Sequence, residues 1–263
     1  MTQQLEFRRI VLGLPYNRPG HGMRLATELA HLLQLDLFGL FVEEESLRGL
    51  AALPFAREFR PLGGGWQPLN MEQLSRDFEI AGKSAEKVFT EAAKTLRTTC
   101  KFEVVRGSMA ETIASISRAG DIVLITEPEG AADRTSPQFL SSLNAALRSA
   151  AAVLLVPSRI ARHSGAIVAV AHEPDDPSID VAKAIALASR EELVVLETAQ
   201  SGIGAAVGNV AERLIVISRV PGSSPSAIAS LRRVPILIVD RTRGKFGIDR
   251  SSRLEVEDFE AKQ

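Results

Sequence analysis

Cysteine and long apolar runs are scarce in this chain of 263 residues. Its single cysteine, Cys100, excludes an internal disulfide framework. The longest unbroken apolar run, Ala150–Val156, is far shorter than the ~20 residues that a membrane-spanning helix needs. The opening residues, MTQQLEFRR, lack the apolar stretch of a secretion signal. These absences predict a cytoplasmic protein that has no membrane span.

A surplus of either charge is also missing. The chain has 31 Lys and Arg residues against 32 Asp and Glu residues, so its formal net charge is −1. Such a balance offers no bulk attraction to nucleic acid or to an anionic membrane. The four histidines are scattered without the spacing of a metal site. Ser141 and Ser142 have no Gly-x-Ser-x-Gly turn around them. We therefore expect no metal, no catalytic nucleophile and no enzymatic activity.

What the sequence does contain is an alternation of short apolar runs with segments of helical period. This alternation is typical of a parallel sheet covered by helices, an α/β fold. Strands buried on both faces should be continuously apolar, and the amphipathic segment Met71–Leu96 supplies a long helix. Five strands are predicted in this part of the chain: Arg9–Leu14, Leu37–Val42, Phe102–Val105, Ile122–Ile125 and Val153–Val156.

The pattern then starts again. A second series of strands is predicted at Ala166–Ala171, Leu193–Leu196, Leu214–Ile217 and Ile236–Val239. One helix–strand unit is missing from this second series, so we interpret the chain as an internal duplication with a truncated second copy. The predicted domains are residues 1–160, residues 161–240 and a charged tail at 241–263.

An insertion at residues 44–69 interrupts the first copy after its second strand. One interpretation is a lid over the strand ends, in which Arg57 and Arg60 bind an acidic ligand and Trp66 stacks on a ring. The other is that the apolar residues of the insertion pack against the protein or against a second chain. We favour packing or association.

Two stretches resemble a known family. The ending ASISRAGDIVLIT, followed by LNAALRSAAAVLLVP, and its echo SLRRVPILIVD resemble universal stress protein domains in tandem, over about Arg8 to Asp240. The resemblance implies a Rossmann-like sheet of strand order 3-2-1-4-5 in each copy. It also implies that the fifth strands of the two copies pair antiparallel, Val153–Val156 against Ile236–Val239.

Nucleotide-binding members of that family carry Gly-x-x-Gly, nine residues and Gly-Ser/Thr after the fourth strand. Glycines at those positions let backbone N–H groups approach phosphates. Laid along this pattern, the chain has Thr126 and Glu129, then Phe139 or Leu140, and Ser141 as the hydroxyl. A side chain therefore occupies every glycine position.

Two further observations argue against a nucleotide. Glu127, Glu129 and Asp133 place carboxylates where phosphate oxygens would lie. The Asp that ends the first strand in the family is replaced by Pro15 in the first copy and by Ala171 in the second. The resemblance and these departures together predict loss of ordinary ATP binding.

The sequence thus predicts a non-enzymatic, universal-stress-protein-like protein that acts by binding or association in a stress response, without ATP. A homodimer, a protein partner and a small anionic ligand all fit this prediction. The alternative is a protein that binds or slowly hydrolyses ATP under a lid bearing Arg57 and Arg60. The candidate pocket residues are Pro15, Thr126, Glu129, Ser141, Arg57 and Arg60.

Overall fold

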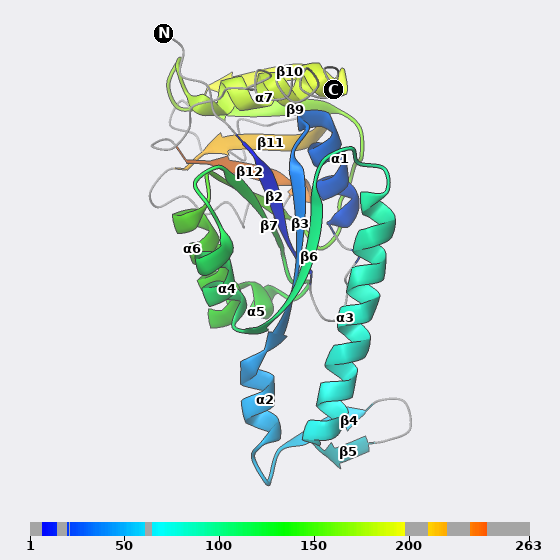
Figure 1. Cartoon of the computed structure of the whole chain (residues 1–263). Coiled ribbons are helices and arrows are strands. Elements are labelled where there is room, and N and C mark those ends of the chain that lie inside the picture. The colour runs from blue at the N-terminus through cyan, green and yellow to red at the C-terminus, as the bar shows by residue number, and fades with distance from the viewer. Residues whose placement is uncertain are drawn as a thin grey trace, which may run out of the picture.

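Nine strands form one continuous sheet in the computed structural model of the chain (Figure 1). The structure describes residues 7–14, 20, 22–60, 65–197, 210–219 and 232–240, with only the backbone of Arg60. The strand order is β10-β9-β11-β12-β8-β7-β2-β3-β6. The predicted α/β fold with a large, mostly parallel sheet is confirmed.

The first half of the sheet has the predicted order 3-2-1-4-5, with all neighbouring strands parallel. Three of its strands are longer than the apolar runs alone indicate, because their ends carry polar residues. Its strands are β2 (Arg9–Leu14), β3 (Asp36–Glu44), β6 (Cys100–Gly107), β7 (Asp121–Thr126) and β8 (Ala152–Val156).

The second half continues the sheet with four strands. Neighbours within it are again parallel, and β10 ends the sheet on that side. These strands are β9 (Ala166–Ala171), β10 (Leu193–Glu197), β11 (Glu212–Ser218) and β12 (Ile236–Val239).

The two halves meet where β12 pairs antiparallel with β8. The register places Ile236 opposite Leu155 and Val239 opposite Ala152. Both strands are fully buried there, so their backbone groups need partners inside the protein. The predicted antiparallel pairing of these two segments is confirmed.

Helices cover both faces of the sheet. On one face lie α1 (Met23–Leu33), α3 (Met71–Ala93) and α7 (Pro177–Ser189), and on the other lie α4 (Met109–Ile116) and α6 (Pro137–Ser149). In the described part of the chain, no helix is both long and apolar enough to cross a bilayer.

Gly39 of β3 determines how closely α3 approaches the sheet. A Cβ atom at Gly39 would lie 2.5 Å from the ring of Phe89 and 2.9 Å from that of Phe102. The Phe89 ring on α3 therefore fills the space above the glycine, and its centroid lies 5.6 Å from that of Phe102.

The insertion forms a helix and a hairpin beyond the end of β3. Helix α2 (Glu45–Ala51) is followed by β4 (Arg57–Arg60) and β5 (Gly65–Pro68), which pair antiparallel beside the start of α3 (Figure 1). Arg48 fastens α2 by an ion pair of 2.6 Å to Glu43 and a hydrogen bond of 3.2 Å to Ser75. The described part of the predicted insertion thus projects beyond the sheet.

Candidate functional site

The segment after β7 begins with two buried polar groups. Thr126 ends the strand, and its Oγ1 is buried without a hydrogen-bond partner among the described residues. The N–H of Glu127 donates to the carbonyl of Val156 at 2.8 Å, which extends the pairing of β7 with β8 by one residue. Glu127 is almost entirely buried, with an exposed fraction of only 2%.

The helix that follows this loop has a closed N-terminus. Ser136 caps α6 by accepting a hydrogen bond from the N–H of Phe139 at 3.3 Å. The first helical residue is Pro137, which has no N–H to offer. A phosphate needs free N–H groups at such a helix end, and this end supplies few of them. Ser141 lies in the second turn of α6, exposed, and does not line the cavity beside the loop.

A cavity of about 290 Å³ lies beside the loop, and both acids and bases line it. Glu127 and Glu129 face it together with Arg134, Arg159 and Arg233. Nη1 of Arg134 donates a hydrogen bond to a carbonyl of the loop itself, that of Glu129, at 3.1 Å. The cavity wall therefore holds two carboxylates and three guanidinium groups, one of them partly engaged by the loop.

Of the two predicted lid arginines, the structure places the side chain of Arg57 alone. Arg57 is exposed on β4, and the hairpin does not line the cavity beside the loop. Of Arg60 only the backbone is described, and Pro15 lies outside the described residues. Thr126 and Glu129 alone are placed by the structure in or beside the loop where the sequence predicted the pocket.

In the second half, the acidic segment after β9 caps a helix. Asp176 caps α7, accepting hydrogen bonds from the N–H groups of Ser178 and His172 at 3.0 Å each and from the hydroxyl of Ser218. Burial alone would raise the pKa of this carboxyl, but the hydrogen bonds outweigh burial and lower the pKa below its usual 3.8. Asp176 is only 3% exposed, so this helix cap is buried.

Another cavity, of about 640 Å³, opens at the other edge of the first half, where its strands begin. Arg9 in its wall is held by Asp121 at 2.6 Å and lies over the ring of Phe38, 4.9 Å from the centroid. Ligands of open α/β sheets bind at the carboxyl ends of strands. We therefore assign this basic cluster to holding β2 against β7.

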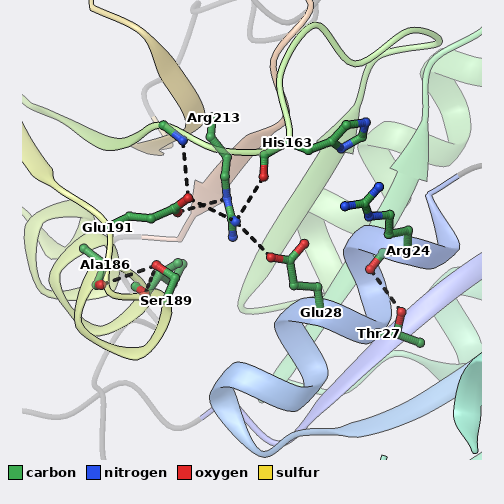
Figure 2. A network of polar contacts seen from close by, with 10 residues as sticks. Arg24, Thr27, Glu28, His163, Ala186, Ser189, Glu191 and Arg213 are labelled. Atoms are coloured by element: carbon green, nitrogen blue, oxygen red, sulfur yellow. Dashed lines mark hydrogen bonds and ion pairs between the residues drawn. The ribbon is translucent and has the colours of Figure 1, made fainter. Parts of the chain in front are cut away.

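A third cavity, about 350 Å³, lies at the junction of the two halves, and the sequence did not predict it. Its walls come from the start of α1, the segment 158–163, Arg213 of β11 and Pro235. Figure 2 shows Arg213 reaching between the halves, with Glu28 of α1 on one side and Glu191 on the other. The one available signal was the pair Glu212-Arg213, two charges that open an otherwise apolar strand.

Arg213 is almost entirely buried, with its side chain 8% exposed. Nη1 lies 2.9 Å from the carboxylate of Glu28 and donates to the carbonyl of His163 at 3.3 Å, while Nε lies 3.1 Å from Glu191 (Figure 2). Neighbouring Glu212 pairs with Arg232 at 2.8 Å. Of these ion pairs, the one between Arg213 and Glu28 joins α1 of the first half to the second half, and the others lie within the second half.

The projection formed by the insertion has an apolar surface, which we call the tip surface. Its residues all have large apolar side chains that are exposed. Phe55, for example, is 77% exposed and Trp66 is 65% exposed. Of the two forms of the packing prediction, burial against the rest of the chain is wrong, because these side chains are exposed and the hairpin extends away from the sheet (Figure 1). Association with a second chain stays a prediction. The tip surface consists of Leu47, Leu50, Leu53, Phe55, Phe59 and Trp66.

Comparisons with known proteins define the fold. No family profile matches the chain, and no curated protein matches its sequence. Among solved structures, it is similar to a universal stress protein from Archaeoglobus fulgidus, with a TM-score of 0.54, 12% identity and coverage of 94% of this chain and 99% of that one. A protein of unknown function from Pseudomonas aeruginosa gives a TM-score of 0.50 at 12% identity, with coverage of 89% and 92%. The chain therefore has a fold similar to that of universal stress proteins across both halves of its sheet.

Proposed function

We propose that the chain is a tandem universal-stress-protein-like protein that acts in a stress response by binding a small anion or another protein, without using ATP. Residues 1–160 and 161–240 are its two copies. The sheet supports this division, because the order of the first half recurs in β10-β9-β11-β12 with one strand fewer, across the β8–β12 pairing. The proposed tail, 241–263, lies outside the described residues.

The observation that carries the ATP-independent role is the closed N-terminus of α6. Ser136 already accepts the hydrogen bond of Phe139, and Pro137 removes a further donor. A triphosphate at this position would have to displace the cap, which is worth roughly 1 kcal/mol. It would gain few free N–H groups in return.

The carboxylates of the loop add to this cost. Glu127 and Glu129 line the cavity in which phosphates would have to lie. A like-charge pair ~4 Å apart costs roughly 4 kcal/mol at an effective dielectric constant near 20, about half of the binding free energy of a micromolar ligand. Arg134, Arg159 and Arg233 line the same cavity and offset part of this cost. The alternative role, ATP held under a lid, lacks its main support, since Arg57 does not line this cavity.

Calorimetry and melting curves with ATP test the proposal. A ligand present at ~1,000 times its dissociation constant stabilises a protein by ~4 kcal/mol, so millimolar ATP would visibly raise the melting temperature of a micromolar binder. We expect no rise and no binding heat. The matched gain-of-function variant combines Thr126→Gly, Glu129→Gly and Leu140→Gly with Pro15→Asp, and we expect weak binding to return. A clear binding heat for ATP with the unaltered chain would refute the ATP-independent role.

The association part of the proposal is supported by the tip surface. Phe59 and Trp66 face each other across the hairpin, with ring centroids 5.5 Å apart, and both remain exposed. Contiguous exposed apolar residues of this kind mark surfaces that bind other proteins. A second copy of the chain or another protein fits this surface.

A further inference from the structure

The first turn of α1 offers backbone donors to the junction cavity. The helix starts after Gly22, whose φ of 79° suits a glycine. A Cβ at this position would lie 3.0 Å from Leu124, so the absence of a side chain also allows α1 to start close to β7. No side chain caps this helix end, and its first turn has no acidic residue. Among the described residues, the N–H groups of Arg24 and Leu25 have no acceptor.

A helix end alone does not make a site, but Arg213 supplies a second and independent observation. Its Nη2 is buried and has no hydrogen-bond partner among the described residues, although Nη1 and Nε are both engaged. Arg213 lines the same cavity as Arg24 and Leu25. A buried guanidinium donor without an acceptor is costly, so a shift of the Arg213 side chain that brings Nη2 to an anion in the adjoining cavity would recover part of that cost.

The cavity also has more positive than negative charge. Arg24 and Arg159 both line it, and neither has an ion-pair partner among the described residues. Arg162 lies 3.7 Å from Glu212, at the limit of an ion pair. The only carboxylate in the wall, as far as the described residues go, is that of Glu28, and it is already paired with Arg213. An added anion therefore meets unneutralised guanidinium groups.

From this geometry we infer that the junction cavity binds a phosphate group, either as inorganic phosphate or as the phosphate of a small metabolite. The N–H groups of Arg24 and Leu25 would bind one side of it, and Arg213 and Arg159 the other. The volume of about 350 Å³ is at the small end of ligand pockets. The inference rests on the proposed role as a binding protein, but it concerns a cavity other than the loop after β7.

Isothermal calorimetry at low salt with inorganic phosphate, and separately with glycerol 3-phosphate, tests the site. We expect binding of at least one of the two, and tighter binding of glycerol 3-phosphate if the natural ligand is an ester. Arg24→Ala and Arg159→Ala should each weaken binding about tenfold or more, the usual effect of losing a charged hydrogen-bond donor. Both side chains are exposed, so both variants should keep the melting temperature. The matched control is Arg76→Ala on α3, whose side chain is 73% exposed.

Glu28→Gln tests whether removing a negative charge from the cavity raises its affinity for phosphate. This change removes the carboxylate that competes for Arg213, so affinity for phosphate should rise even if the melting temperature falls. The inference would be overturned if the unaltered chain bound no phosphate. It would also be overturned if Arg24→Ala and Arg159→Ala bound phosphate as tightly as the unaltered chain, or if Glu28→Gln bound it more weakly. ATP binding that survives Arg24→Ala would instead overturn only the ATP-independent role, so the two failures can be told apart.

Discussion

Replacing Arg213 by methionine should weaken the junction of the two halves and lower the free energy of unfolding. The change Arg213→Met keeps an unbranched side chain of similar reach but removes the guanidinium that pairs with Glu28 and Glu191. Breaking a buried ion pair by removing one partner costs about 3–5 kcal/mol, because the other charge stays buried. The Glu191 side chain is 16% exposed and Glu28 is 35% exposed, so Glu28 regains water easily. We therefore expect the lower end, about 3 kcal/mol.

For a chain of this size, each kcal/mol shifts the melting temperature by about 2–4 °C, so Arg213→Met should melt roughly 6–12 °C lower. Urea unfolding followed by circular dichroism measures the loss directly. The double variant with Glu191→Gln should recover part of it, because the more buried of the two carboxylates is then no longer left unpaired. Arg76→Met breaks an exposed pair with Glu72 and should change almost nothing. If Arg213→Met melts as Arg76→Met does, the junction is not held by this network.

Two further predictions concern acid stability and association. The carboxylate of Asp176 has a pKa lower in the folded than in the unfolded chain, so its stabilising effect is present above about pH 4 and is lost as the pH falls through the folded value. Asp176→Asn should lower the unfolding free energy at pH 7 and flatten its acid dependence, and a slope unchanged from the parent below pH 4 would contradict this. Phe55→Ser with Trp66→Ser should reduce self-association in sedimentation without lowering the melting temperature, because both side chains are exposed. Leu187→Ser, an 81% exposed position on α7, is the matched control, and equal association of all forms would argue against the tip surface.

The order of the sheet could be predicted because each buried parallel strand is a continuous apolar run. Ile122–Ile125 and Val153–Val156 show this most clearly, since both faces of these strands are covered. The hairpin was missed because REFR and GWQP contain only one large apolar residue each. Phe59 and Trp66 become neighbours only through the cross-strand register.

The candidate sites were less predictable than the strands. Loss of the glycine pattern could be seen in Thr126 and Glu129, but the cap by Ser136 depends on where α6 begins. The junction cavity could not be found from sequence, because Arg24 and Arg213 belong to different halves. Only the antiparallel pairing of β8 with β12 brings them to one place.

That same pairing gives the sheet two edges of different chemistry, which we call its two poles. Since β8 and β12 run in opposite directions, the strand ends at Thr126 and at Ser218 lie on opposite edges of the sheet. A symmetric dimer would repeat every substitution at both poles, whereas a single chain lets each pole change alone. The hydrogen-bonded carboxylate of Asp176 at one pole and the mixed-charge loop of Glu127 and Glu129 at the other are such a difference. A molecule bound at one pole leaves the opposite pole open to a second, chemically different one.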